Sequence, residues 1–295
     1  MRENYPREEI MMSGHLACQG CGGSAAMRHV LKAMGEDTIC VIPACCWTII
    51  SGPYPYSALK TPILHTAFET SGAAASGVRA ALDMNGNTTT QVMVFAGDGG
   101  TFDIGLQSLS GAAERNENFI YFCYDNEAYM NTGIQRSGAT PDKAWTTTTP
   151  EKHPKRGPKK NMVQILAGHK VPYVATANVA FPEDLIAKVK KAKKIYGTKF
   201  IHILAPCPPG WRMSSEMSIE VARLATYTKI FPIYEVYNGE EYHINIEPRD
   251  IPVLDYLKLQ GRFRHLSKED VDEIQKRTDY EWRILLQKAM NERFR

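Results

Sequence analysis

The sequence of 295 residues lacks any apolar run close to the ~20 residues that a membrane-spanning helix requires. Its first fifteen residues are charged and have no apolar core of a secretory signal, so we expect a cytoplasmic protein with no membrane role. An excess of one charge is also lacking, because 35 basic and 32 acidic residues leave a net charge of +3, too little to predict nucleic-acid binding. What the chain has is 43% hydrophobic residues, which predicts a folded protein with a large core.

Cysteine is plentiful, with seven residues and no secretory context that would favour disulfides. Cys18 and Cys21 form a C-x-x-C pair, Cys46 follows 25 residues after Cys21, and Cys207 lies in the segment APCPPGW. A C-x-x-C pair alone is compatible with a redox pair, a zinc knuckle or half of an iron–sulfur site. Because the remaining candidates are scattered along the chain, whereas a compact zinc finger keeps its ligand pairs close, the pattern favours an iron–sulfur cluster in a preformed fold.

The first 205 residues alternate β-branched runs with stretches rich in Ala, Leu and Met, which predicts an α/β fold with a mostly parallel sheet flanked by helices. The predicted strands read as nearly continuous apolar runs, so we expect the sheet to be buried on both faces. They span residues 38–42, 91–96, 118–124, 171–176 and 200–204. The predicted helices, with apolar residues near a 3.6-residue period, span residues 24–34, 70–84, 104–115 and 182–195.

The pattern changes in the last third of the chain. We therefore predict an α/β domain over residues 1–210 and a C-terminal extension for subunit contacts over residues 211–295. Asn238-Gly239 between two alternating segments predicts a hairpin. Ser267, with Asp270 three residues later, predicts the start of a terminal helix over residues 268–294. On that helix, a docking surface is expected at Trp282, Ile284 and Leu285.

Two further segments leave alternatives open. Residues 71–81, rich in Gly and Ala, indicate either a tightly packed core helix or a helix that closely approaches a ligand. Residues 146–160, TTTTPEKHPKRGPKK, predict an irregular basic loop. Its composition favours a solvated loop over a contact with an acidic partner or a phosphate.

Residues 91–131 carry the pattern that is most informative about function. A predicted strand ends in Gly97-Asp98-Gly99-Gly100, a predicted helix follows, and the next strand ends at Asp125-Asn126. In a right-handed βαβ unit both strand ends lie at the same edge of the sheet, so Asp98 and Asn126 can converge. A carboxylate and an amide oxygen suit Mg²⁺, which is often shared with phosphates, and the glycines would let backbone N–H groups approach those phosphates. GDGG alone is an ordinary turn, but the surrounding strands, helix and Asn make the motif specific.

This pattern, followed by YMNTG at residues 129–133, resembles the thiamin diphosphate motif of 2-oxoacid:ferredoxin oxidoreductases, in particular the β chains of pyruvate synthases. The resemblance covers nearly the whole chain, including SGHLACQGCG, GDGGTFDIGLQSLSGAAER and LAPCPPGW. It implies a thiamin diphosphate-binding fold, with Mg²⁺ held by Asp98, Asn126 and the backbone carbonyl of Ala128, and with Asn131 as a catalytic residue near the thiazolium ring. The residues that it places around the cofactor are Gly97, Asp98, Gly99, Gly100, Thr101, Cys46, Trp47, Thr48, Asn126, Tyr129, Asn131 and Thr132.

The same resemblance implies that a [4Fe–4S] cluster is held by Cys18, Cys21, Cys46 and Cys207, with Cys45 as the alternative to Cys46. Residues 43–47, PACCW, depart from the small polar segment usual in the family, and a Trp at position 47 could reshape the substrate pocket. The two other cysteines lie in strand-like apolar runs and are predicted to be buried structural thiols, Cys40 and Cys123.

The implied activity is the oxidative decarboxylation of a small 2-oxoacid, with pyruvate first, CoA as acyl acceptor, and electrons passing singly through the cluster to ferredoxin. The implied partners are an α subunit that supplies the activating Glu, and γ- and δ-type subunits with further iron–sulfur clusters. Glu69 is a weaker candidate for that carboxylate. An oxalate oxidoreductase that needs no CoA is the alternative. A non-redox thiamin enzyme would have no use for the dispersed cysteines, and an electron-transfer subunit would have no use for the GDGG motif.

Overall fold

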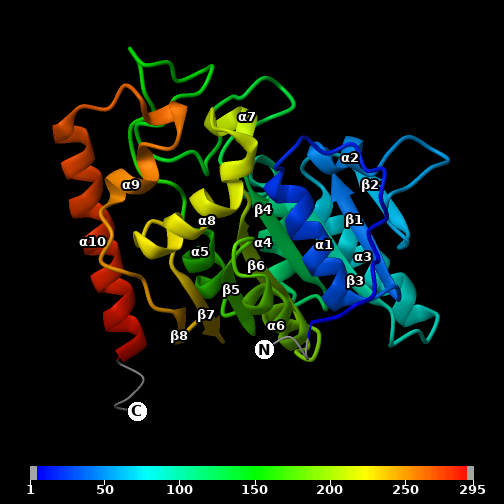
Figure 1. The fold of residues 1–295 in the computed structure, drawn as a ribbon. Helices are drawn as coiled ribbons and strands as arrows, with labels where there is room; N and C mark the ends of the chain where they lie inside the picture. Colours follow the sequence, from blue (N-terminus) through cyan, green and yellow to red (C-terminus); the bar gives the residue numbers. More distant parts are fainter. Residues whose placement is uncertain (1–4, 291–295) are drawn as a thin grey trace.

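The computed structural model describes residues 5–290, and its centre is an eight-stranded sheet with the strand order β2-β1-β3-β4-β6-β5-β7-β8 (Figure 1). The first six strands in this order run parallel, whereas β7 and β8 pair antiparallel at one edge. In chain order the strands are β1 (Thr38–Pro43), β2 (Ile63–Thr66), β3 (Gln91–Gly97), β4 (Ile120–Asp125), β5 (Tyr173–Asn178), β6 (Lys199–Leu204), β7 (Ile233–Tyr237) and β8 (Glu241–Ile246).

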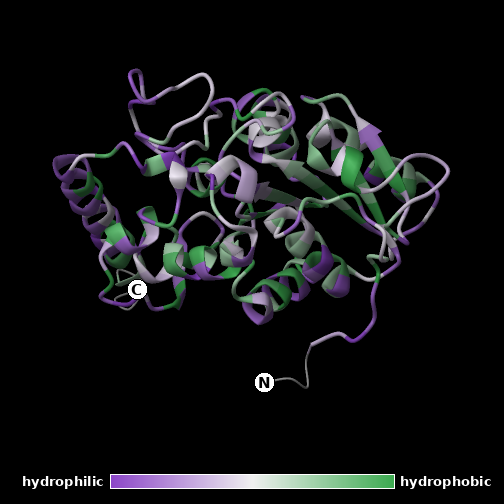
Figure 2. Cartoon of the chain, turned by 45° about the horizontal axis from the view of Figure 1, so that its top comes forward, coloured by the Kyte–Doolittle hydropathy of each residue, from purple (hydrophilic) through white to green (hydrophobic). Residues whose placement is uncertain are grey.

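Helices cover both faces of the sheet, as the apolar strands require. They are α1 (Gly22–Met34), α2 (Cys46–Ile50), α3 (Ser71–Met84), α4 (Leu106–Glu114), α5 (Met162–Gly168), α6 (Pro182–Ala192), α7 (Pro208–Trp211), α8 (Ser218–Tyr227), α9 (Val253–Leu257) and α10 (Lys268–Met290). Side chains alternate along β3: Phe95 joins the core under α1 and α6, whereas Val94 joins the core under α3, α4 and α5. The central strands are accordingly mostly hydrophobic, whereas hydrophilic residues are frequent on the outer helices and in the loops (Figure 2).

The predicted α/β architecture and its long elements are confirmed, with bounds that shift by a few residues. The sequence did not indicate β2, which has only four residues at the sheet edge and no buried run, or the short helices α2, α5, α7 and α9 and the longer α8. The Gly/Ala-rich segment proves to be a packed helix, because a Cβ on Gly72 would lie 2.6 Å from the carbonyl oxygen of Ser108 in α4. No helix within residues 5–290 is long and apolar enough to cross a membrane.

The C-terminal third adds β7, β8 and α10 to the edge of the same sheet. The predicted hairpin is present, and Asn238 (φ 50°) and Gly239 (φ 76°) adopt the positive φ angles that its tight turn requires. The predicted cap is also present, because the Ser267 and Asp270 side chains each accept a hydrogen bond from the other's backbone N–H. The predicted continuation of this helix to residue 294 lies outside the described residues.

The predicted docking face of α10 is buried against the sheet, with Trp282 8% exposed and Leu285 9% exposed. We expect Trp282→Ala to lower the free energy of unfolding by about 3 kcal/mol, because it removes a large buried side chain and leaves a cavity. Tyr280→Ala, on the exposed face of the same helix, should change it by less than about 0.5 kcal/mol. Urea unfolding of the two variants checks the difference, and equal effects would show that α10 is not docked through this face.

Candidate functional site

The ends of β3 and β4 bring together the acidic and amide side chains that the sequence analysis singled out. The register pairs Gly97 with Tyr124, so Asp98 and Asp125 leave neighbouring strands side by side. Both side chains are buried, with Asp98 1% exposed and Asn126 6% exposed. The predicted convergence of Asp98 and Asn126 is therefore seen in the structure.

Oxygen atoms meet at this point in a way that suits a divalent cation. One atom of the Asn126 side-chain amide lies 2.8 Å from the carbonyl oxygen of Ala128 and 3.0 Å from an oxygen of Asp98. If this atom is the amide nitrogen, it donates to both oxygens; if it is the amide oxygen, three oxygens face one another and only a cation makes their approach favourable. Octahedral Mg²⁺ with ligands at about 2.0–2.1 Å separates neighbouring ligands by roughly 2.9 Å. Asp98 and the Ala128 carbonyl therefore offer oxygen ligands for Mg²⁺, and Asn126 offers a third when its amide oxygen faces them.

The carboxylate of Asp98 has too few partners nearby to favour its negatively charged form. Its Oδ2 accepts a hydrogen bond of 2.5 Å from the hydroxyl of Ser137. Even so, burial and the neighbouring charge of Asp125 raise the pKa of Asp98 well above its usual value. A cation bound here would favour the ionised form.

Asp125 differs because protein groups already compensate its charge. His202 Nε2 lies 2.6 Å from its Oδ2, Lys159 forms an ion pair with the same oxygen, and the backbone N–H of Glu127 donates to Oδ1 at 2.9 Å. Although burial opposes ionisation, Lys159 and His202 hold the pKa of Asp125 at about 2. Glu127 is itself buried and pairs with Lys159 at 2.8 Å and with Arg262 at 2.6 Å. Asp125 is therefore a fixed charge that stabilises the turn.

The basic loop over residues 146–160 differs from the solvated loop that its composition favoured. Lys159 enters the buried network described above, and Lys155 is 5% exposed and donates to the carbonyl of Thr140. Lys160 pairs with Asp103 at 2.8 Å. The expectation was wrong for Lys155 and Lys159, because buried carboxylates and carbonyls near the sheet edge provide partners that local sequence does not reveal, whereas Lys160 is exposed. The segment around residues 151–153 is exposed, as expected.

The turn after β3 is a π-helical segment, η1 (Gly99–Asp103), in which glycine is required by packing. A Cβ on Gly99 would lie 2.2 Å from the ring of Tyr129. The Tyr129 hydroxyl donates to Asp103 at 2.6 Å, and its backbone exchanges two 2.9 Å hydrogen bonds with Gln135. The Thr101 hydroxyl donates a hydrogen bond to the Gly97 carbonyl at 2.8 Å. The backbone of Thr101, rather than its hydroxyl, would therefore be available to a cofactor. The close fit of Tyr129 on Gly99 holds the two predicted cofactor segments together.

The four predicted cluster cysteines gather at the start of α1, α2 and α7. The backbone N–H of Cys21 donates to the Cys18 carbonyl at 3.2 Å. Burial, followed by the charges of neighbouring thiols that include Cys207 and Cys21, raises the pKa of Cys46 to about 12. Burial raises the pKa of Cys207 to about 12, and Cys21 and Cys18 add to this effect. A group of thiols that suppress one another's ionisation needs metal cations to become thiolates, which suits a cluster.

No group of three or more His, Cys, Asp or Glu side chains within residues 5–290 is arranged to hold a metal ion, and this includes the four cysteines. The two adjacent cysteines face different surroundings. Cys46 lies near Cys207 and Cys21 and contacts Asn131 Oδ1 through its sulfur at 3.4 Å. Cys45 caps α2, where its sulfur accepts a hydrogen bond from the Thr48 backbone, and it lies beside Gly97.

The remaining predicted residues are either buried in the core or exposed to solvent. The Trp47 indole is fully buried, donates to the Gly23 carbonyl at 3.2 Å and packs edge-on against Phe95, so its ring belongs to the core rather than to an open substrate pocket. Thr48 is exposed, and its hydroxyl bonds within the turn that starts α2. The other exposed residues are Asn131, Thr132 and Glu69. As predicted, Cys40 and Cys123 are fully buried in the strands.

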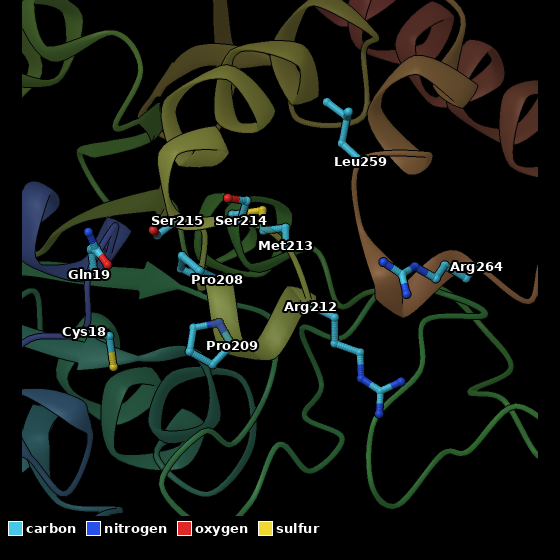
Figure 3. A pocket seen from close by; sticks show the side chains of 10 residues that line it. All are labelled: Cys18, Gln19, Pro208, Pro209, Arg212, Met213, Ser214, Ser215, Leu259 and Arg264. Carbon is cyan, nitrogen blue, oxygen red and sulfur yellow. The ribbon is translucent and has the colours of Figure 1, made fainter.

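A surface pocket of about 690 Å³ opens beside the cysteine group (Figure 3). Cys18 lies on one side, Pro208 and Pro209 follow Cys207 in the middle, and Arg264 lies on the opposite side. Arg212 also lines the pocket, and its guanidinium stacks 3.1 Å from the centroid of the Trp145 ring. The exposed thiol of Cys18 thus faces solvent across the pocket from the two arginines.

Sequence reasoning missed Ser137, Lys159 and Arg262. Ser137 and Arg262 carry no motif, and Lys159 was one of several lysines in a loop. One signal in the sequence could have indicated such residues. Asp98 and Asp125 lie next to each other on neighbouring parallel strands, and two buried carboxylates need positively charged or hydrogen-bonding partners, although the sequence does not identify them.

Comparisons with known proteins agree with this geometry. A family described as thiamine pyrophosphate enzyme, C-terminal TPP binding domain, matches residues 45–203. The ketoisovalerate oxidoreductase subunit VorB of Pyrococcus furiosus is 52% identical over 297 residues, covering 96% of this chain and 94% of that protein. The pyruvate synthase subunit PorB of Methanocaldococcus jannaschii is 47% identical over 292 residues, covering 95% and 98%.

A solved 2-oxoglutarate:ferredoxin oxidoreductase from Magnetococcus marinus has the same fold, with a TM-score of 0.60 and 22% identity over 76% of this chain and 81% of that one. The thiamin diphosphate-binding fold predicted from the sequence is thereby confirmed. The resemblance to the pyruvate synthase β chains is confirmed as well. The chain belongs to the 2-oxoacid:ferredoxin oxidoreductase family as a thiamin diphosphate-dependent β subunit.

Proposed function

We propose that this subunit binds thiamin diphosphate through Mg²⁺ and passes electrons from a 2-oxoacid, one at a time, to a [4Fe–4S] cluster held by Cys18, Cys21, Cys46 and Cys207. The contact between Cys46 and Asn131, 3.4 Å from sulfur to amide oxygen, carries the proposal. It joins the predicted cluster ligands to the predicted thiamin residues, so that donor and acceptor of the electron would be neighbours.

The residues at the ends of β3 and β4 offer oxygen ligands for Mg²⁺, whereas the four cysteines lie near one another but are not arranged to hold a metal ion within the described residues. Asp98, Asn126 and the Ala128 carbonyl would hold Mg²⁺, since the Asn126 amide lies 2.8 Å from the Ala128 carbonyl oxygen and 3.0 Å from an Asp98 oxygen and can present its own oxygen to a cation placed between them. When bound, thiamin diphosphate supplies the electron sink for decarboxylation of the 2-oxoacid. Asn131 is exposed beside Cys46, where its amide can hydrogen-bond a substrate or the cofactor. Ser137 holds Asp98 in position through its 2.5 Å hydrogen bond.

The names of the relatives suggest which 2-oxoacid is the substrate. Identity is higher to the subunit named for ketoisovalerate, 52%, than to the subunit named for pyruvate synthesis, 47%. We therefore favour a short branched-chain 2-oxoacid, with pyruvate, the substrate expected from the sequence, as the second candidate. CoA would accept the acyl group in either case, whereas an oxalate oxidoreductase would need none.

Partner subunits would complete the site. An α subunit would supply the activating glutamate, since Glu69 is exposed. Cys18 opens into the pocket that Arg212 and Arg264 line, a surface suited to an acidic electron acceptor such as ferredoxin or a γ- or δ-type iron–sulfur subunit.

Replacement of the metal-binding carboxylate should separate the two cofactors. Asp98→Ala is expected to weaken retention of Mg²⁺ and thiamin diphosphate by about 10–100-fold or more while iron stays bound. The check is thiamin and metal content of the complex purified without air, with Asp272→Ala on the exposed side of α10 as control. Full retention of thiamin by Asp98→Ala would refute the metal assignment.

The reciprocal change should remove the cluster alone. We expect Cys207→Ala to lose cluster iron and sulfide, about four of each per chain, and to keep thiamin diphosphate. Cys40→Ala is the matched control, because that buried thiol bonds Thr61 instead of the other cysteines. Iron analysis and the visible absorption of the cluster decide the matter, and an unchanged iron content would exclude Cys207 as a ligand.

Substrate preference is measurable on the complete complex with reduction of ferredoxin as readout. 2-Oxoisovalerate should show a kcat/KM about tenfold or more above that of pyruvate, because added methyl groups bound in an apolar pocket are worth roughly 10–200-fold. A preference for pyruvate would restore the expectation from the sequence. Turnover of oxalate without CoA would contradict both candidates.

A further inference from the structure

The segment that carries Asn131 is a short loop closed at its base. The backbones of Tyr129 and Gln135 exchange two hydrogen bonds of 2.9 Å, so residues 130–134 project from this pair. Asn131 is exposed in the loop, and its side-chain oxygen lies 3.4 Å from the sulfur of Cys46. The position of the Asn131 amide therefore depends on how firmly the loop is held.

The second half of this loop has a backbone conformation that a branched side chain disfavours. Gly133 has a φ of 108° and Ile134 has a φ of 60°. Glycine adopts positive φ angles readily, whereas a β-branched residue does so rarely because its side chain crowds the backbone. A residue keeps such a conformation only where surrounding contacts impose it, and such residues cluster at functional sites. Contacts from elsewhere in the chain therefore have to hold Ile134.

Thr147 supplies these contacts from the TTTT turn of residues 146–149. Its hydroxyl donates to the carbonyl of Gly133 at 2.7 Å and lies 3.0 Å from the carbonyl oxygen of Ile134. The same Ile134 oxygen accepts the backbone N–H of Thr147 at 2.9 Å. Thr147 is exposed, so its hydroxyl adds nothing to the core. Its hydroxyl and its N–H instead bond the two residues that have positive φ angles.

Thr148 holds the end of the loop, and the other two threonines shape the turn. The hydroxyl of Thr148 accepts the backbone N–H of Arg136 at 3.0 Å. Thr146 and Thr149 exchange backbone hydrogen bonds of 3.1 and 3.2 Å, and their hydroxyls lie 2.7 Å apart. The bonds from Thr148 and from its neighbour in the turn reach backbone groups of the loop, so they set the path of its chain directly.

We propose that Thr147 and Thr148 are positioning residues, which hold the strained end of the loop so that the Asn131 amide is in place before cofactor and substrate bind. This inference rests on the proposed function, in which Asn131 hydrogen-bonds one of them. The physical reason is that a group already fixed loses less conformational entropy when it forms its hydrogen bond, and is correctly oriented for reaction.

Amide hydrogen exchange tests the hold on the loop without any cofactor. Thr147→Val keeps the shape of the side chain and removes its hydroxyl. The amides of residues 130–136 should therefore exchange about tenfold faster in the complete complex prepared without thiamin diphosphate. Thr147→Ser retains the hydroxyl and should exchange at the wild-type rate. The control is Thr88→Val, the same change at an exposed threonine before β3, which should leave the loop unchanged.

The cofactor-loaded complex shows whether the position of Asn131 matters. In Thr147→Val, kcat/KM for the 2-oxoacid should fall about ten- to a hundredfold, because small misplacements of a group at the reaction centre cost this much. Thr147→Ser should restore it. The KM for ferredoxin should stay at the wild-type value, since other segments line the pocket beside Cys18. General damage to the fold would alter both quantities.

Ile134 itself offers a second test. Asn adopts positive φ angles more readily than Ile, so Ile134→Asn should relieve the strain in the loop. The increase in exchange rate that Thr147→Val causes should then be smaller in a chain that also carries Ile134→Asn. An equal increase in both backgrounds would contradict the link between Thr147 and Ile134.

The exchange and activity data together decide the proposal. Loop exchange that stays at the wild-type rate in Thr147→Val would overturn it, and so would faster exchange throughout the chain. Faster exchange confined to the loop with an unchanged kcat/KM would exclude the positioning role. If Thr147→Val fails to assemble, Thr148→Val decides by the same criteria, because it removes the acceptor of the Arg136 N–H. Failure of the proposed function would appear instead as full thiamin retention in Asp98→Ala, whereas loop exchange needs no cofactor.

Discussion

Parallel pairing of β3 with β4 places Gly97 opposite Tyr124, so the next residues along the two strands, Asp98 and Asp125, emerge side by side in a buried environment. Two carboxylates cannot both remain ionised there without cations close by. The protein compensates only one of them. Lys159 and His202 surround Asp125, whereas Asp98 receives a single hydroxyl and keeps a raised pKa. Asp125 is therefore a charge that the protein itself neutralises, whereas Asp98 is suited to a cation from outside the chain.

The neighbouring segments are connected through the charged partners of Asp125 and Glu127. Lys159 reaches Asp125 and Glu127 together, which ties the basic loop to the carboxyl edge of the sheet. Arg262 reaches Glu127 from the last third of the chain and also stacks 4.0 Å from the centroid of the Trp211 ring, four residues after Cys207. The turn that carries Asn126, the basic loop and α7, which follows Cys207, are thus connected through these buried contacts, since the Trp211 indole also donates to the Asn126 carbonyl.

The sequence predicted those features that depend on interactions between residues close together in the chain. The alternation of apolar strands and helices, the Asn238-Gly239 turn and the Ser267 cap depend on neighbours a few residues away, and each is present. Asp98 and Asn126 were found because the rule for βαβ units converts sequence order into position. Lys159 could not be found in this way, because its partners are Asp125 and Glu127, which lie more than thirty residues earlier in the chain. The burial of Trp47 was missed for the same reason, since Gly23 and Phe95 provide its surroundings.

The pairing of Glu127 with Arg262 has a consequence for biosynthesis. Arg262 is synthesised 136 residues after Asn126, which at about 5–20 residues per second corresponds to roughly 7–27 s on the ribosome. Of the two ion-pair partners that Glu127 has in the folded structure, Lys159 is synthesised first. The turn that carries Asn126 and Ala128 reaches its final charge balance only when the end of the chain has been made and has folded back onto the sheet. A chain that ends before residue 262 would lack the guanidinium that pairs with the buried Glu127.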